Sequence, residues 1–168
     1  LNPELVGRDP AEREWLWSRL PILSGRRGLS MNAWAPVDVA LWDIAGKAAG
    51  APVHKLLGTQ RYKTEIYGPY PPRHITPEGY VREAETFRDA GFRAYKIHPG
   101  VMATPDVVNM VGAVRDNVGD GMELMLDPNN GYSFRKAYDI GRALDDQGFY
   151  WYEDPVPYYD VDAISLLT

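Results

Sequence analysis

Residues 87–96 (FRDAGFRAYK) and residues 144–153 (LDDQGFYWYE) follow one pattern. In each stretch a helix ends, the chain turns at a glycine followed by phenylalanine, and a short strand with aromatic residues begins. We expect strands at residues 63–67, 92–97, 122–126 and 149–152, with a proline-rich loop at residues 68–75. Strands that alternate with helices pair in parallel and are covered by those helices. The sequence therefore predicts an α/β fold with a parallel sheet after Gly58.

Three helices are expected between these strands, each opened by a capping residue or a proline. Thr76 and Pro77 open the first, Thr104 and Pro105 open the second, and Ser133 caps the third. One face of each helix is apolar, which indicates that this face is buried against the sheet. The apolar faces consist of Tyr80, Ala84 and Phe87, then Val107, Val111, Val114 and Val118, then Ala137, Ile140 and Leu144.

The chain up to Gly58 is predicted to be helical and to form a separate domain. Pro10 is expected at the first position of one helix and Pro36 at the first position of a longer one. Gly50 is expected to end the longer helix in a left-handed conformation. The apolar stripe of that helix consists of Val37, Leu41, Ile44 and Ala48. We therefore divide the chain into a helical domain at residues 1–58 and a sheet domain at residues 59–168.

The composition excludes several classes of protein. The 168 residues are 45% hydrophobic and 24% charged, which is the balance of a globular protein. A net charge of −5 argues against nucleic acid or a membrane surface as a partner, because both bind basic patches. The absence of cysteine excludes disulfides, zinc–thiolate sites and thiol nucleophiles. No apolar run approaches the roughly 20 residues of a membrane span, and no signal peptide is recognisable, so we expect a cytoplasmic protein.

Charged side chains are expected where successive strands end. Lys96 and His98 end the second strand, Asp127 the third and Glu153 the fourth. A (β/α)8 barrel collects its catalytic groups in this way, from the carboxyl ends of several strands. The alternative is a doubly wound nucleotide-binding sheet, but neither G-x-G-x-x-G nor G-x-x-x-x-G-K-[ST] occurs. The pattern therefore favours the first half of a (β/α)8 barrel of the TIM type.

Asp127 and Glu153 are candidate metal ligands. They are 26 positions apart, which is one strand–helix unit, so they are expected at equal depth on neighbouring strands. Two carboxylates so placed repel each other unless positive charge lies between them, and Mg²⁺ prefers oxygen ligands. Taken singly, Asp127 could be a turn-forming Asp-Pro and Glu153 a solvated strand end. Their succession in adjacent units favours the metal.

Lys96 and His98 form a candidate acid–base pair. Residues two apart on a strand point to the same face. A cationic lysine disfavours a protonated imidazole beside it, so His98 is expected to accept a proton near neutral pH. An isolated K-x-H would more simply be a basic, solvated strand end, but its position on the strand before Asp127 favours catalysis. Asn129 either binds a substrate oxygen or shapes the loop, and Asp154 either supports the metal ligands or acts as a cap.

Four motifs, in this order, resemble one family. They are VDVALWDIAGKAAGAPVHKLLG (residues 37–58), YKIHPG (95–100), LMLDPNNGY (124–132) and YWYEDP (150–155). Together they look like the end of the capping domain and the first four barrel strands of the mandelate racemase and muconate lactonizing branch of the enolase superfamily. The resemblance implies that Asp127 and Glu153 are the first two of three Mg²⁺ ligands. It also implies that Lys96 and His98 occupy the two lysine positions of the family's K-x-K motif, the second of which is the usual base.

The resemblance further implies abstraction of the proton next to a substrate carboxylate and stabilisation of the resulting enediolate by Mg²⁺. We expect a dehydratase that acts on a small carboxylate, a sugar acid. The alternatives within the superfamily are a racemase or epimerase and a cycloisomerase.

The number of residues after Gly58 is too small for a complete barrel. A barrel of eight strands takes about 250 residues, and about 110 follow Gly58. We therefore expect a fragment, with the third metal ligand beyond Thr168. The alternative from another class is a catalytically inactive half-barrel. Open sheet edges favour self-association, so a homo-oligomer is expected.

Overall fold

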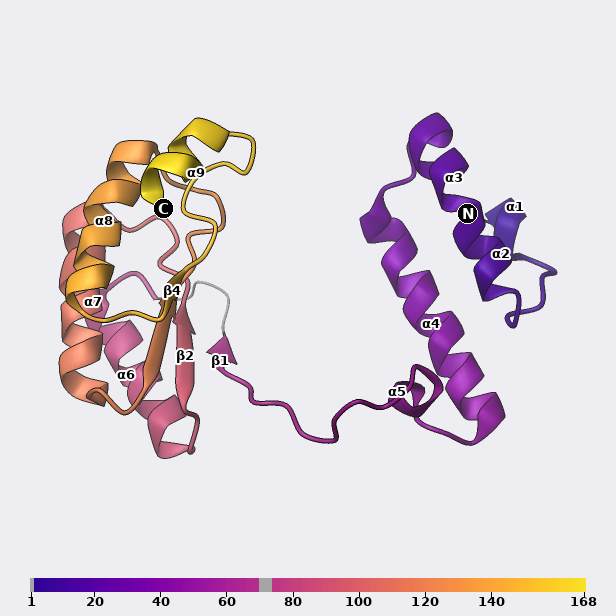
Figure 1. Cartoon of the computed structure of the whole chain (residues 1–168), viewed down its shortest axis with the longest axis horizontal. Coiled ribbons are helices and arrows are strands. Elements are labelled where there is room, and N and C mark those ends of the chain that lie inside the picture. Colours follow the sequence, from indigo (N-terminus) through magenta and orange to yellow (C-terminus); the bar gives the residue numbers. More distant parts are fainter. Residues whose placement is uncertain (1, 70–73) are drawn as a thin grey trace. The chain divides into compact units, whose positions relative to one another are not determined.

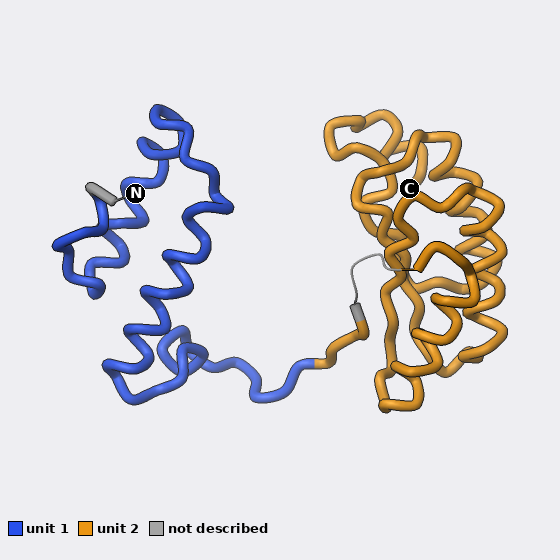
Figure 2. Tube along the Cα trace, turned by 180° about the vertical axis from the view of Figure 1, so that it is seen from behind, with its two compact units in different colours: residues 1–64 blue, residues 65–168 orange. Residues whose placement is uncertain are grey.

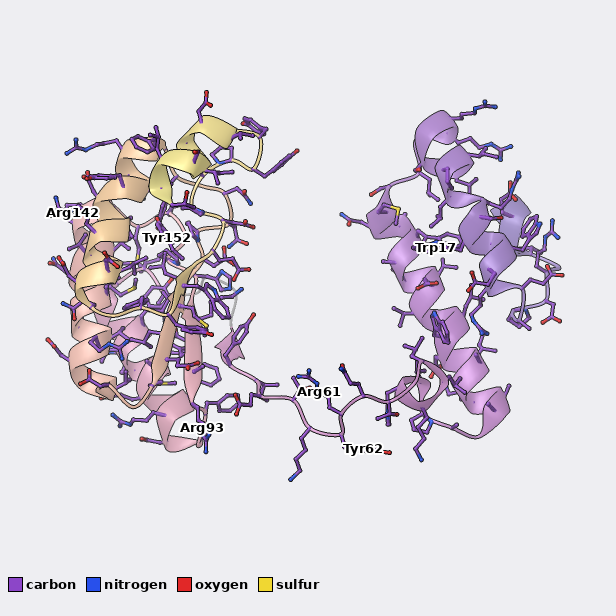
Figure 3. All side chains as sticks on the ribbon, viewed as in Figure 1. Trp17, Arg61, Tyr62, Arg93, Arg142 and Tyr152 are labelled. Carbon is purple, nitrogen blue, oxygen red and sulfur yellow. The ribbon has the colours of Figure 1, made fainter. Side chains whose placement is uncertain are left out.

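The computed structural model describes residues 2–69 and 74–168. The chain divides into two compact units, Leu1–Thr64 and Glu65–Thr168, which are coloured separately in Figure 2. Residues 59–67, which include Arg61 and Tyr62 (Figure 3), lie in neither helix nor strand. The domain boundary after Gly58 therefore stays a prediction.

The N-terminal unit is helical, as the sequence predicts. It contains α1 (Asn2–Leu5), α2 (Arg13–Ser18), α3 (Leu20–Arg27), α4 (Met31–Ala49) and α5 (Val53–Leu56). Its core consists of Leu16, Leu20, Trp34 and Leu41. Helix α2 begins at Arg13, so the prediction of a helix start at Pro10 is wrong.

Helix α4 begins five residues before Pro36, which was wrongly predicted to open it. The helix is capped by Ser30, whose hydroxyl accepts a hydrogen bond from the Asn32 N–H at 3.2 Å. Pro36 therefore lies inside the helix, where its missing N–H leaves the Asn32 carbonyl without its usual donor. The turn before Pro36 buries Trp34 to 1% exposure, and this burial offsets the lost bond.

The apolar stripe predicted on α4 is only partly buried. Leu41 is buried and Val37 packs against the core. Ile44 is 45% exposed, and Ala48 is exposed as well. Both lie beyond Leu41, the last α4 residue of this core cluster, so the short helices α1, α2 and α3 do not cover them.

The C-terminal unit is a parallel sheet with helices on one side. Its elements are β1 (Gly68–Pro69), α6 (Pro77–Asp89), β2 (Ala94–Ile97), α7 (Thr104–Val118), β3 (Glu123–Leu126), α8 (Phe134–Asp146), β4 (Trp151–Tyr152) and α9 (Val161–Leu167). The strand order is β1-β2-β3-β4, and each neighbouring pair is parallel. Figure 1 shows α6, α7 and α8 along the same face of the sheet. A strand order without reversal, covered on one face, is that of a half-barrel rather than a doubly wound sheet.

The helix-facing side of the sheet forms the larger core. Alternate strand residues face the helices because side chains alternate along a strand. These residues are Tyr95, Ile97, Leu124 and Leu126, and they pack with Val107, Val111, Val114, Ala137, Ile140 and Leu144 of the predicted helix faces. Tyr152 of β4 lies against α8 (Figure 3), where its ring would be 3.6 Å from a Cβ added at Gly141. The predicted apolar faces of α6, α7 and α8 are thus confirmed.

The strand predicted at residues 63–67 is wrong. The structure places β1 at Gly68–Pro69, where Gly68 pairs with Tyr95 and Pro69 with Lys96. Ile66 is 68% exposed, so the predicted stretch has little apolar surface to bury. Gly68 fits instead because the Phe87 ring lies where a Cβ would be. Part of the proline-rich loop predicted at residues 68–75 lies outside the described residues.

Among the residues that the structure describes, no helix is both long and apolar enough to cross a membrane.

Candidate metal and acid–base site

The carboxyl ends of β2, β3 and β4 bring the predicted site residues together. In the ladder Leu126 pairs with Tyr152, so Asp127 and Glu153 are the next residues on neighbouring strands. The Asp127 N–H donates to the Ile97 carbonyl at 2.9 Å, and the Glu153 N–H donates to the Leu126 carbonyl at 2.9 Å. These bonds extend the sheet by one residue and hold both carboxylates at the same edge, as the sequence predicts.

Lys96 connects the two carboxylates. Its Nζ lies 3.2 Å from Oδ2 of Asp127 and 2.9 Å from Oε2 of Glu153. Lys96 and Asp127 are 7% and 5% exposed. Burial opposes the charge of the ammonium, but the hydrogen bonds to Glu153 and Asp127 outweigh burial and raise the pKa of Lys96 above its ordinary value. The positive charge expected between the carboxylates is therefore supplied, in this structure, by a lysine.

His98 contacts the same loop as Asp127. Its Nδ1 lies 3.1 Å from the Asp127 carbonyl oxygen and 3.1 Å from Nδ2 of Asn129. A neutral imidazole nitrogen either donates or accepts, so these two contacts exclude each other. When Nδ1–H donates to the carbonyl, Nε2 keeps a free lone pair and is able to accept a proton.

Asn129 shapes the loop after β3. Its backbone N–H donates to Oδ1 of Asp127 at 2.8 Å, and its φ is 52°, a left-handed conformation that asparagine tolerates. One oxygen of Asp127 is therefore held by the loop while the other faces Lys96. Asn129 therefore shapes the loop, which is one of the two roles expected from the sequence. The other role, binding a substrate oxygen, stays a prediction.

Two neighbours of the site were not found from the sequence. The Tyr80 hydroxyl donates to the His98 carbonyl oxygen at 2.6 Å, and no sequence signal separates Tyr80 from an ordinary core residue. Trp151 Nε1 donates to Oε2 of Glu153 at 3.1 Å. Trp151 and Glu153 are two positions apart at the end of the fourth strand, and this spacing could have indicated the contact between them.

The donor set fits a hard divalent cation. Asp127 Oδ2 and Glu153 Oε2 converge on one positive charge, and Mg²⁺ takes one or two protein carboxylates and completes its shell with water. Asp127 and Glu153 are therefore the residues that could hold it. Within residues 2–69 and 74–168, no group of three His, Asp or Glu side chains is placed to hold a metal ion.

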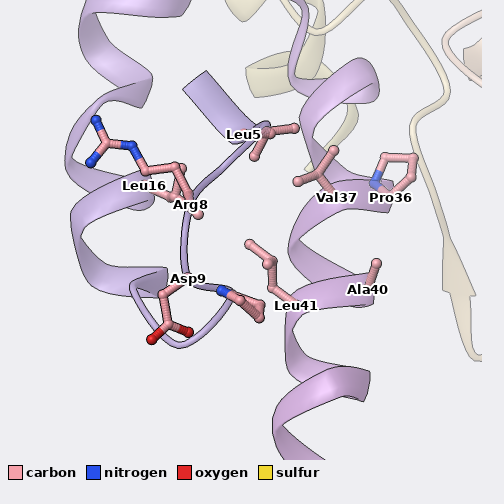
Figure 4. A pocket seen from close by; sticks show the side chains of 9 residues that line it. Leu5, Arg8, Asp9, Leu16, Pro36, Val37, Ala40 and Leu41 are labelled. Atoms are coloured by element: carbon pink, nitrogen blue, oxygen red, sulfur yellow. The ribbon is translucent and has the colours of Figure 1, made fainter. Parts of the chain in front are cut away.

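The N-terminal unit contains a cavity of a different character. It has a volume of about 330 Å³. It lies between α4 and the part of the chain from Leu5 to Leu16 (Figure 4). Arg8 and Asp9 are the charged residues of its lining, and the rest is apolar. It therefore lacks the converging carboxylates and the imidazole found at the strand ends.

Two family descriptions match the chain. Residues 1–58 match the N-terminal domain of the mandelate racemase / muconate lactonizing enzyme family. Residues 79–168 match the enolase C-terminal domain-like family.

Curated relatives and a solved structure agree with these matches. The chain is 32% identical to an arabinonate dehydratase from Saccharolobus solfataricus over 97% of the chain and 46% of that protein. It is 35% identical to a D-galactarolactone cycloisomerase from Agrobacterium fabrum over 96% of the chain and 44% of that protein. The solved structure is that of a D-glucarate dehydratase from Agrobacterium tumefaciens in complex with magnesium, which superposes on the chain with a TM-score of 0.88 at 33% identity. The superposition covers 99% of this chain and 47% of the dehydratase.

The chain thus spans about half the length of the relatives it matches. The matches to both domains, together with the half-barrel fold, confirm the resemblance seen in the sequence. The chain belongs to the mandelate racemase / muconate lactonizing enzyme family of the enolase superfamily.

Proposed function

We propose that the protein containing this chain is a Mg²⁺-dependent dehydratase of a sugar acid, and that it removes the proton next to the substrate carboxylate. The observation that carries this proposal is the convergence of Asp127 and Glu153 at one sheet edge, with His98 beside Asp127. Two carboxylates and an imidazole within one cluster are the groups that such proton abstraction uses.

Each residue then has a defined part in the reaction. His98 Nε2 takes the proton from the carbon while Nδ1–H is held by the Asp127 carbonyl. Lys96 keeps its charge next to the carboxylates and faces the negative charge of the substrate. Asp127 and Glu153 would hold the Mg²⁺ ion, and Asn129 would bind a substrate oxygen. A bound Mg²⁺ supplies positive charge where negative charge develops on the substrate carboxylate. The neighbouring hydroxyl then leaves as water with the proton that His98 Nε2 had taken, which returns the imidazole to its neutral form and completes a dehydration.

The choice of a dehydratase is supported by the similar arabinonate and D-glucarate dehydratases, whose names specify sugar acids. The similar D-galactarolactone cycloisomerase favours a second candidate, ring opening of a sugar lactone. Both reactions leave an enol that becomes a keto acid, because each removes the proton next to the carboxylate and expels an oxygen from the neighbouring carbon. The two candidates are separated by substrate and by mass: dehydration consumes an open-chain sugar acid and gives a product lighter by one water, whereas cycloisomerisation consumes a lactone and gives a product of the same mass.

A non-catalytic half-barrel is also favoured by one observation. The Lys96 ammonium already bridges the two carboxylates and offsets one of their two negative charges, so neither carboxylate is left without a cationic partner when no metal is bound. Tyr150 is 63% exposed next to β4, and Trp151 of β4 is 37% exposed. These exposed aromatic residues support self-association of the chain into a homo-oligomer.

The experiment that tests the proposal is exchange of the substrate α-proton with solvent deuterium in the whole protein. His98→Asn keeps polarity and approximate size but removes the base, so exchange should fall by roughly 10²–10⁴-fold. The affinity for Mg²⁺ should stay nearly unchanged. His54→Asn, a change on α5 of the N-terminal unit, is the matched control and should exchange at the wild-type rate. Exchange by His98→Asn at the wild-type rate would show that the base lies elsewhere.

A further inference from the structure

The loops that follow β3 and β4 are joined beyond the end of the sheet. The Asn130 N–H donates to the Asp154 carbonyl at 2.7 Å, and the Tyr132 N–H donates to the Pro155 carbonyl at 3.2 Å. The two loops therefore stay paired after the ladder itself has ended at Leu126 and Tyr152.

Side chains reinforce this pairing. Nδ2 of Asn130 donates to Oδ2 of Asp154 at 3.4 Å. The opposite orientation of the amide would place two oxygen acceptors against each other, so the contact fixes which way the amide faces. The remaining Asn130 Oδ1 is buried without a hydrogen-bond partner among the described residues. Leaving this oxygen unpaired costs free energy, which indicates that the contact with Asp154 governs how the amide is placed.

The backbone at both residues is strained. Asn130 has a φ of 61° and Asp154 a φ of 41°. Non-glycine residues in this region are uncommon, and Asn and Asp are the types that tolerate it best. The left-handed conformation at these two residues turns the loops toward each other. Asn130 lies three residues after Asp127, and Asp154 lies directly after Glu153.

We propose that Asn130 and Asp154 are positioning residues that fix the separation of Asp127 and Glu153. This inference rests on the proposed function, in which those two carboxylates hold Mg²⁺. Lys96 also joins them, but a bound cation competes with its ammonium for the same oxygens. The contact between the loops is separate from those oxygens, so it supports the spacing in the metal-free chain and maintains it when Lys96 no longer bridges the carboxylates.

Glycine variants test the contact without disturbing the backbone. Asn130→Gly and Asp154→Gly adopt positive φ without strain and keep the bond between the two main chains. Asp154→Asn also removes the charge, but it keeps an oxygen that accepts from Asn130. Comparing Asp154→Asn with Asp154→Gly therefore separates the effect of the contact from the effect of the charge.

The first measurement is amide hydrogen exchange in the metal-free 168-residue chain. In both glycine variants, exchange should accelerate about tenfold or more at the Asp127 and Glu153 N–H groups. The Tyr150 N–H, which donates to Leu124 at 2.7 Å within the sheet, should exchange at the wild-type rate. Asp154→Asn should behave like the wild type. Equal acceleration at all three amides, or none at Asp127 and Glu153, would overturn the inference.

The second measurement is the Mn²⁺ affinity of the whole protein, followed by the electron paramagnetic resonance signal of free Mn²⁺. The glycine variants should bind about tenfold more weakly or worse, as is typical when supporting residues of a metal site are removed, and Asp154→Asn should stay near the wild type. Unchanged affinity in the glycine variants overturns the positioning role but leaves the metal assignment standing. A whole protein that binds no more Mn²⁺ than its Asp127→Asn variant overturns the metal assignment, and the positioning role with it.

Discussion

The charge of Lys96 holds two carboxylates that would otherwise repel each other. Asp127 is buried, while the Glu153 side chain is 37% exposed. A buried carboxylate that loses the lysine paired with it is strongly destabilising, and a partly exposed one is screened by water. The Lys96 ammonium is therefore a stabilising group of the metal-free chain as well as a candidate catalytic one.

Lys96→Met should lower the free energy of unfolding by about 3 kcal/mol, the lower end of the cost of breaking a buried ion pair. Urea unfolding at pH 7 without divalent metal measures it. Lys47→Met is the control, because Lys47 pairs with Asp43 at 2.6 Å on the surface, with side chains 75% and 58% exposed. That change should cost under about 0.5 kcal/mol. Equal losses in the two variants would contradict a stabilising role for the buried bridge.

Tyr80 should stabilise the chain below its pKa and lose this effect in alkali. Burial and the neighbouring Glu83 carboxylate raise the pKa of Tyr80 to about 12. A group whose pKa is raised on folding stabilises fully below its unfolded pKa, about 10, and loses that contribution as the pH rises through 12. At pH 7, Tyr80→Phe should cost about 1 kcal/mol for the lost bond to His98.

The measurement is urea unfolding of both proteins at pH 7 and pH 11. Between these values the wild type should lose more stability than Tyr80→Phe, because only the wild type has this hydroxyl to ionise. An identical loss in the two proteins would show that Tyr80 does not contribute to the alkaline transition.

At the scale of elements, β1 depends on a close approach between Gly68 and α6. A Cβ at Gly68 would overlap the ring of Phe87, which stacks on Tyr95 at a centroid distance of 5.4 Å. Because that ring is held between neighbours, it cannot yield easily. The edge strand is therefore specified by one small residue rather than by a run of apolar ones.

Gly68→Ala should destabilise the chain by about 1–3 kcal/mol, the usual range for overpacking. Gly112→Ala is the same chemical change in α7, where an added Cβ meets nothing within 4 Å. It should stabilise by up to about 1 kcal/mol, because alanine is the better helix former. Thermal unfolding of the two variants gives the comparison, and a stabilised Gly68→Ala would show that β1 does not need the close approach.

Some of these helices and strands could be predicted from the sequence and others could not. Helices α6, α7 and α8 have a capping residue or proline and a full apolar stripe, so pattern and burial agree. The start of α4 was missed because Pro36 is typical of a first turn, although Ser30 supplied a capping signal. The β1 strand was misplaced because two residues carry no periodicity, and the fit of Gly68 against Phe87 is a tertiary contact that no local pattern encodes.

The predicted positions of the site residues follow from the same logic. One strand–helix unit separates Asp127 from Glu153, so their common edge could be predicted from spacing alone. That Lys96 reaches both carboxylates could not, because the direction of a long flexible side chain is decided by its partners in space. The contact between Asn130 and Asp154 also depends on two left-handed residues, which the sequence permits but does not dictate.

For the molecule as a whole, the 168-residue chain should bind Mg²⁺ weakly and turn over little substrate. Two carboxylates converge within the described residues, so water must supply the other ligands, and Lys96 competes for the same oxygens. We expect a Kd of about 1 mM or weaker by titration calorimetry. With arabinonate or D-glucarate as substrate, keto acid should form no faster than with Asp127→Asn. Rapid Mg²⁺-dependent keto acid formation by the 168-residue chain, lost in Asp127→Asn, would show that these two carboxylates suffice for catalysis and that no further metal ligand is needed.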